Sequence, residues 1–270
     1  MPETPSWATA TDMVAVLDLE RIDRDLFRAV NTGGADVRPN LYGGQVAAQA
    51  LRAAALTVAD DRFPHSLHGY FLRPGRFDLP VILHVDRDRD GRSFTARHVT
   101  AVQDGEVIFS MIASFHIDEP SAVLDRLPHG PVPPPEKPSR SDWAGILEMV
   151  EVTTTDLLDD PPRHTDKLWV RVAHPLPDDR IVQACALAYV SDLGSGFGQI
   201  ADFRLPAGGP SIDHALWFHD PIRADDWVLL EMWPDKAGGS RGVYHGSLRD
   251  RDGRLGGLLA QEMLLRERVR

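Results

Sequence analysis

Three polar residues, Asp192, Ser211 and Gln261, stand in segments of the chain that are otherwise apolar. Burying the carboxylate of Asp192 is costly unless other groups hydrogen bond to it, and a hydroxyl and an amide are suitable partners. Two interpretations fit this set. It is either a satisfied polar cluster at a seam between domains, or a site where the aspartate acts as general base on a water molecule that the hydroxyl and the amide hold.

Water activation of this kind suits an ester-like substrate with a good leaving group. A thiolate leaves readily because a thiol is far more acidic than an alcohol, so no strong general acid is needed. The polar set is therefore compatible with cleavage of a thioester.

An internal repeat is what distinguishes the three residues. Residues 211–219 resemble residues 65–73, which lie 146 positions earlier, and a proline follows each stretch. With small changes of offset, the first half of the chain has other residue types where the second half has the polar set: Leu56, His65 and Ala113. A carboxylate, a hydroxyl and an amide thus occur in one half only.

Neighbouring residues keep other assignments open. In this alignment His68 and His214 are equivalent, so we expect both to be structural, bonded to the backbone across a sheet. Asp213 is an alternative base, because strand alternation places it on the same face as Ser211. The aromatic residues of these stretches are expected in the core: Phe71, Trp217 and Phe218.

Each half contains the pattern of one helix and several strands. The alanine-rich residues 45–57 predict a helix, and residues 180–192 predict its counterpart. Glycines in the loop 31–44 leave the first N–H groups of the earlier helix open to a ligand. Apolar alternation predicts strands at residues 65–72, 79–87, 94–103, 106–116, 211–219, 227–233, 240–249 and 255–265. The pairs Asp104-Gly105 and Asp252-Gly253 predict hairpin turns.

The remaining segments complete the organisation. Residues 12–30 predict a helix or a helix-strand lead-in, residues 143–152 and 168–173 two further elements, and residues 194–209 a glycine-rich loop. Residues 119–140 hold seven prolines, which predicts an extended linker. We therefore expect two α+β repeats, residues 12–118 and 141–270, joined by that linker. Their sheets should pair edge to edge, since each alone would leave an exposed edge.

Composition narrows the class of protein. The 270 residues carry a formal net charge of −11, so the chain offers no general basic surface to nucleic acid. Cys185 is the single cysteine and cannot form an internal disulfide or a zinc cage, which indicates a reducing cytoplasm. Neither a signal peptide nor an apolar run of membrane-spanning length is evident. We expect no membrane insertion.

One short motif could mislead. Residues 238–242 (GGSRG) match the letters of the G-x-S-x-G nucleophile elbow. An elbow needs a strand, a turn and a helix, with an aspartate and a histidine later in the chain. Here a strand pattern follows, so we expect a turn between strands.

Six stretches together resemble the acyl-CoA thioesterase II family, whose members carry two hotdog folds in one chain. The resemblance covers nearly the whole chain, from about residue 26 to residue 266. The stretches that carry it are residues 41–50 (LYGGQVAAQA), 65–75 (HSLHGYFLRPG), 90–97 (DGRSFTAR), 188–193 (AYVSDL), 211–219 (SIDHALWFH) and 260–262 (AQE).

The resemblance implies an α+β double hotdog, in which each antiparallel sheet wraps around a central helix. It places the family's catalytic aspartate on Asp192, its hydroxyl residue, often threonine, on Ser211 and its glutamine on Gln261. It also implies hydrolysis of acyl-CoA to free acid and CoA by an activated water without an acyl-enzyme, in a homo-oligomer. Acyl-CoA is the expected partner, with no cofactor and no metal. Arginines on strand patterns either meet CoA phosphates or offset the acidic surface: Arg92, Arg97 and Arg241.

Two other functions remain open. A hydratase or dehydratase of acyl-CoA on the same fold would use a histidine–aspartate pair, either His65 or His214 with Asp213. A non-catalytic acyl-CoA binding protein would use the polar set structurally. His65 and His219 could also approach the substrate, without an assigned role.

Overall fold

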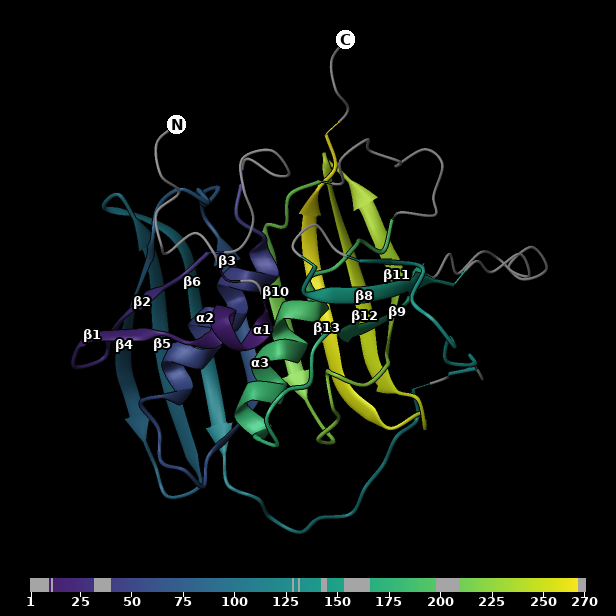
Figure 1. The fold of residues 1–270 in the computed structure, drawn as a ribbon, viewed down its shortest axis with the longest axis horizontal. Helices are drawn as coiled ribbons and strands as arrows, with labels where there is room; N and C mark the ends of the chain where they lie inside the picture. Colours follow the sequence, from purple (N-terminus) through teal and green to yellow (C-terminus); the bar gives the residue numbers. More distant parts are fainter. Residues whose placement is uncertain are drawn as a thin grey trace.

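One large antiparallel sheet forms the frame of the molecule. The computed structural model describes residues 10, 12–31, 40–127, 129–130, 132–141, 145–152, 166–197 and 209–266. Within these residues the sheet has 13 strands in the order β1-β2-β4-β5-β6-β3-β10-β13-β12-β11-β9-β8-β7 (Figure 1). No helix in this part of the chain is long and apolar enough to cross a membrane.

The first half of the sheet surrounds the helix α2 (Gly43–Ala55). A short helix, α1 (Met13–Leu17), comes before it. The predicted helix-strand lead-in is thus correct, and α2 begins two residues before the predicted start. The strands of this half are β1 (Glu20–Asp23), β2 (Leu26–Ala29), β3 (Phe63–Phe71), β4 (Val81–Asp90), β5 (Phe94–Gln103) and β6 (Glu106–His116).

The second half surrounds the helix α3 (Arg180–Ser191). Its strands are β7 (Arg140–Ser141), β8 (Leu147–Glu151), β9 (Asp166–Val172), β10 (Asp213–Phe218), β11 (Val228–Gly238), β12 (Arg241–Asp250) and β13 (Leu255–Leu264). Trp143 and residues 198–208 of the glycine-rich segment lie outside the described residues.

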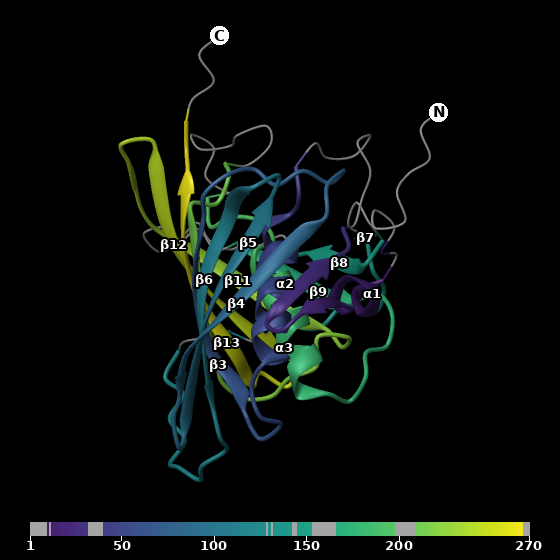
Figure 2. The same cartoon turned by 90° about the vertical axis from the view of Figure 1, so that its left-hand side faces the viewer.

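Both central helices lie on the same side of the sheet (Figure 2). Small side chains on α2 allow the sheet and α3 to approach closely, and five of its alanines have no exposed surface: Ala47, Ala48, Ala50, Ala53 and Ala54. The two helices and the inner face of the sheet share one hydrophobic core. The α+β arrangement of two antiparallel sheets, each around a helix, is confirmed.

The two half-sheets join through β3 and β10, which pair antiparallel with Leu67 opposite Leu216. From this junction the strand order runs outward in the same way on both sides, β6-β5-β4-β2-β1 on one and β13-β12-β11-β9-β8 on the other. The predicted edge-to-edge pairing is therefore confirmed. The chain passes from one half to the other through residues 117–139, whose described part contains neither helix nor strand.

The turns explain two of the short motifs. Asp104 and Gly105 have positive φ of 50° and 78° in the hairpin between β5 and β6, as the sequence predicts. Gly239 and Ser240 have φ of 61° and 62° between β11 and β12. The G-x-S-x-G letters thus form a hairpin turn between two strands, which confirms that they are no nucleophile elbow.

Candidate functional site

The predicted polar set converges at the end of α3. Asp192 is the C-cap residue of that helix and is 8% exposed. Its Oδ1 accepts hydrogen bonds from the Ser211 hydroxyl and from Nε2 of Gln261, both at 3.0 Å. The amide also donates to Oγ of Ser211, at 2.5 Å. The two protons of the Gln261 amide and the single hydroxyl proton therefore each have one acceptor in the set.

A strand irregularity turns Ser211 toward the site. If the pairing of Ala215 with Ala260 continued regularly, Ser211 would lie opposite Leu264, but it lies opposite Met263. One extra residue therefore interrupts the alternation of faces between Ser211 and Ala215. Ser211 consequently shares the inner face with the buried Gln261.

The same irregularity removes Asp213 from the site. Asp213 lies opposite the exposed Tyr70, and cross-strand neighbours share a face, so it belongs to the outer side of the sheet. Its carboxylate accepts the backbone N–H of Glu262 at 2.7 Å. The prediction that Asp213 shares a face with Ser211 is wrong, because simple alternation does not hold across the extra residue.

The N-terminus of α2, from the other half of the chain, completes the site. The N-cap residue of α2, Tyr42, makes no side-chain cap hydrogen bond, and the backbone N–H of Gly44 donates instead to the Asp192 carboxylate. A Cβ built on Gly43 would lie 2.6 Å from Oδ2 of Asp192. The hydroxyl of Tyr42 donates to the carbonyl of Tyr189 at 2.8 Å and fixes the two helix ends together.

Burial decides the proton affinity of this carboxylate. It raises the pKa of Asp192 above the ordinary aspartate value, because the charged form loses its hydration. The charge of His214, the hydrogen bonds from Gln261 and Ser211 and the N–H of Gly44 oppose that rise. Asp192 is thus a more basic carboxylate than one in water, as a general base requires.

His214 extends the network on the inner face of β10. It is 1% exposed, its Nε2 lies 2.8 Å from Oγ of Ser191, and its Nδ1 contacts Oε1 of Gln261. The sequence prediction that His214 bonds to the backbone is wrong. Its supposed equivalent, His68, is exposed on the outer face, where its ring contacts Trp217.

Strand register gives the true counterparts. In the first half Pro64 pairs with Phe115 just before a one-residue shift, as Ser211 pairs with Met263 in the second. Ser211 therefore corresponds to Pro64 and not to His65, and His214 corresponds to Leu67. Every first-half counterpart of the network is apolar: Leu56, Ala55, Pro64, Leu67 and Ala113. The sequence comparison did not include His214 and Ser191 in the polar set, although both have apolar counterparts in the first half when the correct offset is used.

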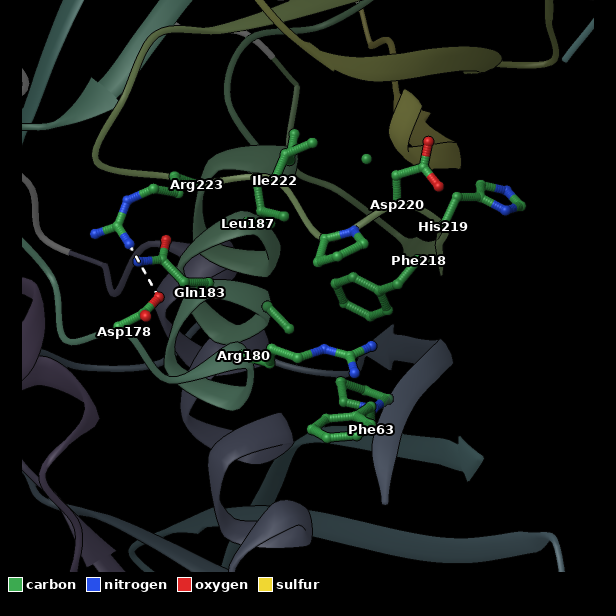
Figure 3. Close-up of a pocket in the computed structure, with 14 residues that line it drawn as sticks. Phe63, Asp178, Arg180, Gln183, Leu187, Phe218, His219, Asp220, Ile222 and Arg223 are labelled. Carbon is green, nitrogen blue, oxygen red and sulfur yellow. Dashed lines mark hydrogen bonds and ion pairs between the residues drawn. The ribbon is translucent and has the colours of Figure 1, made fainter. Parts of the chain in front are cut away.

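A cavity lies at the start of α3, beside the start of β3 and the end of β10 (Figure 3). Apolar and charged side chains line it together, among them Phe63, Leu187, Ile222, Asp178 and Arg180. The first half has Leu56 and Ala113 where the second has Asp192 and Gln261, so it lacks the polar network.

The start of α3 is capped by its own N-cap residue, unlike that of α2. The carboxylate of Asp179 accepts the N–H groups of Ile181 and Val182, at 2.8 and 3.3 Å. The polar network thus occurs in one half only, and its counterparts in the other half are apolar.

The other candidate residues lie elsewhere. Nε2 of His65 hydrogen bonds to Oγ of Ser114 at 2.8 Å, and burial lowers the pKa of this histidine. His219 lines the cavity at the start of α3 (Figure 3). Arg97 is 1% exposed and pairs with Asp90, so it does not face a surface ligand.

Two further expectations concern surface residues. Arg241 is exposed and lies 3.5 Å from a Glu262 carboxylate oxygen, and Arg92 is exposed. Trp217 is 38% exposed on the outer face, so its prediction as core is wrong; Phe71 and Phe218 pack partly buried against the core. Within the described residues no group of three or more His, Cys, Asp or Glu side chains could hold a metal ion.

Known proteins share this architecture. Family models of the acyl-CoA thioesterase N-terminal domain and C-terminal domain match residues 32–116 and 125–265. The chain is 35% identical to acyl-coenzyme A thioesterase 8 of Rattus norvegicus, over 96% of this chain and 90% of that protein.

Solved structures extend the likeness to the fold. The crystal structure of an acyl-CoA thioesterase II, TesB2, from Mycobacterium marinum superposes with a TM-score of 0.82 at 36% identity, covering 95% of this chain and 98% of that one. A protein with a hot dog fold from Alicyclobacillus acidocaldarius superposes with a TM-score of 0.79 at 20% identity, covering 95% and 98%, which bears on the fold alone.

Proposed function

This chain belongs to the acyl-CoA thioesterase family, and on that premise we propose that it hydrolyses acyl-CoA with a water molecule activated by Asp192, Ser211 and Gln261. The chain is thus a thioester hydrolase with the double hotdog fold. One observation carries the assignment of residues: a hydroxyl and an amide converge on one oxygen of a buried carboxylate, and the open start of α2 faces it.

The proposed reaction follows from these positions. Asp192 takes a proton from water, and the water oxygen adds to the acyl carbon of the thioester. The resulting oxyanion develops near the positive end of α2, where backbone dipoles favour negative charge. The carbon–sulfur bond then breaks, CoA leaves as thiolate, and the proton on Asp192 passes to the thiolate or to solvent.

No acyl-enzyme is needed on this route. The hydroxyl of Ser211 donates to Asp192 and accepts from Gln261, so it is placed to position and not to attack. The thiol of Cys185 is fully buried, and burial raises its pKa to about 12, which leaves it protonated. Both features support direct attack by water.

The decisive experiment compares the purified wild-type chain with Asp192→Asn on acyl-CoA substrates of short and long chain, with a thiol reagent as the readout. Wild type should release thiol, and the variant should lose the ~10²–10⁴-fold that a positioned general base supplies. Thiol release that survives the substitution would overturn the role of Asp192. Circular dichroism and melting temperature establish that the variant is folded.

The alternatives fit the geometry less well. A hydratase would need a histidine–aspartate pair, but Asp213 faces outward and binds the N–H of Glu262, while Nδ1 of His214 contacts Gln261. A protein that only binds acyl-CoA would release no thiol in the same assay. Absence of thiol release from wild type would therefore favour hydration or binding.

The domain organisation and the setting are also proposed. We assign residues 12–118 and 141–270 to two repeats joined by residues 119–140, an assignment that the matching of separate family models to residues 32–116 and 125–265 supports. The single cysteine, buried and without a partner cysteine, supports a cytoplasmic location.

A homo-oligomer completes the proposal. Large hydrophobic side chains are exposed on three neighbouring strands of the outer sheet face: Tyr70, Ile112 and Trp217. Such a patch near the junction of the two halves suits contact with a second copy. Sedimentation should show a multimer that Ile112→Glu dissociates, while a monomeric wild type would contradict the assignment.

A further inference from the structure

One buried side chain contacts the proposed catalytic set from behind. His214 is 1% exposed on the inner face of β10, with Oε1 of Gln261 on one side and Oγ of Ser191 on the other. We propose that His214 is a positioning residue, which fixes the carboxamide of Gln261 with its NH₂ toward Asp192 and Ser211. This inference rests on the proposed function and assigns no contact between His214 and the substrate.

Counting protons shows which ring nitrogen matters. Oγ of Ser191 lies within hydrogen-bond distance of both the Ala188 carbonyl oxygen, at 2.9 Å, and Nε2 of His214, at 2.8 Å, but has only one proton. Oε1 of Gln261 can only accept, so Nδ1 of His214 carries a proton in the amide orientation of this structure. The Ser191 proton then decides the role of the other ring nitrogen: Nε2 is also a donor if that proton goes to the carbonyl, and an acceptor if it goes to Nε2.

The orientation of the amide depends on this proton. A carboxamide has two orientations of similar shape and opposite hydrogen-bonding character. In the present one Nε2 of Gln261 donates to Oδ1 of Asp192 at 3.0 Å and to Oγ of Ser211 at 2.5 Å. The flipped amide would place its oxygen, which is itself an acceptor, against the two acceptor oxygens of Asp192 and Ser211. The N–H at Nδ1 of His214 favours the orientation that supplies donors to the site.

The His214 ring is in turn held by a residue of α3, the helix that also carries Asp192. Ser191 immediately precedes Asp192, so one turn of α3 supplies both the partner of His214 and the carboxylate. In the first half the positions of His214 and Ser191 are Leu67 and Ala55, beside Ala113 in place of Gln261. The histidine and the serine thus occur only where there is a carboxamide to orient.

Two substitutions separate the two ring nitrogens. Asn at position 214 keeps an N–H donor near the place of Nδ1, whereas Gln keeps one near the place of Nε2. In the full chain His214→Gln should lower kcat toward the ~10²–10³-fold loss of one polar stabilising group, with KM within about twofold, and His214→Asn should restore most of kcat. His84→Asn, at an exposed histidine of β4, is the control and should keep wild-type kcat.

A double variant tests whether His214 acts through Gln261. His214→Gln in a Gln261→Ala background should cause no further loss of kcat, because the group that it positions is already gone. Three results would each overturn the proposal: losses of kcat that multiply in the double variant, equal kcat for His214→Asn and His214→Gln, or wild-type kcat in His214→Gln. Nitrogen-15 NMR of the wild-type histidines reads the ring directly without any substitution, and a ring unprotonated at Nδ1 would also overturn it.

The failure of this inference is distinguishable from that of the proposed function. If Asp192→Asn and Gln261→Ala keep wild-type turnover, the proposed site is wrong and the role of His214 falls with it. If those two variants lose turnover while His214→Gln does not, only the positioning role is wrong.

Discussion

Oδ1 of Asp192 lies 3.0 Å from Nε2 of Gln261, and this contact leaves the other carboxylate oxygen, Oδ2, beside Gly43. Oδ1 also accepts the Ser211 hydroxyl, so its hydrogen-bonding capacity is used within the set. Oδ2 instead lies close to the start of α2, an approach that the absence of a side chain on Gly43 allows. In the proposed reaction the two oxygens therefore have different tasks: Oδ1 is held by hydrogen bonds, and Oδ2 accepts the proton from water.

Gly43→Ala should disrupt this close approach. The added Cβ would lie 2.6 Å from Oδ2 of Asp192 and 2.9 Å from the Phe71 ring, closer than real Cβ contacts allow, so the carboxylate or the helix must shift. Displacement of a catalytic group by an ångström costs about 10²-fold in rate, and we expect a loss of kcat/KM of that order in the thiol-release assay.

Gly238→Ala is the matched control for this change. No described atom lies within 4 Å of the Cβ that it would add. It should keep wild-type kcat/KM, and an unchanged rate in Gly43→Ala would show that Oδ2 does not need the open start of α2.

The pH dependence of the rate should report Asp192. Burial raises its pKa above the ordinary aspartate value, and only the ionised carboxylate can take a proton from water. The acid limb of kcat/KM should therefore rise with pH above the range of an aspartate in water, from initial rates measured over about pH 4 to 9. An acid limb at the ordinary aspartate pKa would contradict a buried base. Substrate stability at each pH is the necessary control.

The same pKa shift predicts a pH-dependent stability with a definite sign. Because the pKa of Asp192 is higher in the folded chain than in the unfolded one, its contribution to stability is present below the ordinary aspartate pKa. It is lost as pH rises through the folded pKa. Asp192→Asn has no such titration, so its free energy of unfolding relative to wild type should increase as pH rises from about 4. Denaturant unfolding at a series of pH values measures this difference.

Asp225→Asn provides a control of opposite sign. Hydrogen bonds from Arg223 and from the backbone N–H of Leu176 lower the pKa of Asp225, so its contribution is present above the unfolded pKa and is lost as pH falls. The stability of this variant relative to wild type should therefore decrease as pH rises. If the relative stability of the two variants changed with pH in the same way, burial would not be the dominant influence on the pKa of Asp192.

The sequence is sufficient for the local elements and for the residue types of the site. The positive φ values of Asp104 and Gly105 follow from turn chemistry, and the alanines of α2 predict a helix within two residues of its start. The absence of polar counterparts in the first half also singles out Asp192 and Gln261, whose side chains are hydrogen bonded to each other.

What the sequence could not supply is the geometry at irregular positions. One extra residue in β10 decides that Ser211 faces inward and Asp213 outward, and a single residue has no compositional signal that fixes its pairing. The sequence alignment of the two halves was also off by one residue here, which aligned His214 with the exposed His68 and hid its place beside Gln261. The contact of Gly44 with Asp192 joins residues from separate halves, which only tertiary packing determines.

Ser211 should tolerate one substitution and not another. Its hydroxyl donates to Asp192 and accepts from Gln261, and threonine preserves both functions with one added methyl. Ser211→Thr should therefore keep kcat within several-fold of wild type. Ser211→Ala removes one hydrogen bond to a buried charge, worth about 1.5–3 kcal/mol, and should lower kcat by ~10–10²-fold. Equal rates for Ala and wild type would show that the hydroxyl has no role in the rate.

Gln261→Ala should have the larger effect, because the amide contacts three other members of the network. Its Nε2 donates to Asp192 and Ser211 and its Oε1 contacts His214, so truncation leaves three polar groups without this partner. We expect kcat to fall by ~10²–10³-fold with little change in KM. Gln103→Ala separates this effect from loss of a buried amide in general, since Gln103 is also buried and hydrogen bonds to backbone atoms of Arg76 and Leu79. That control should lower the melting temperature and leave kcat unchanged; a matching loss of kcat in both variants would mean that stability, and not the amide beside Asp192, limits the rate.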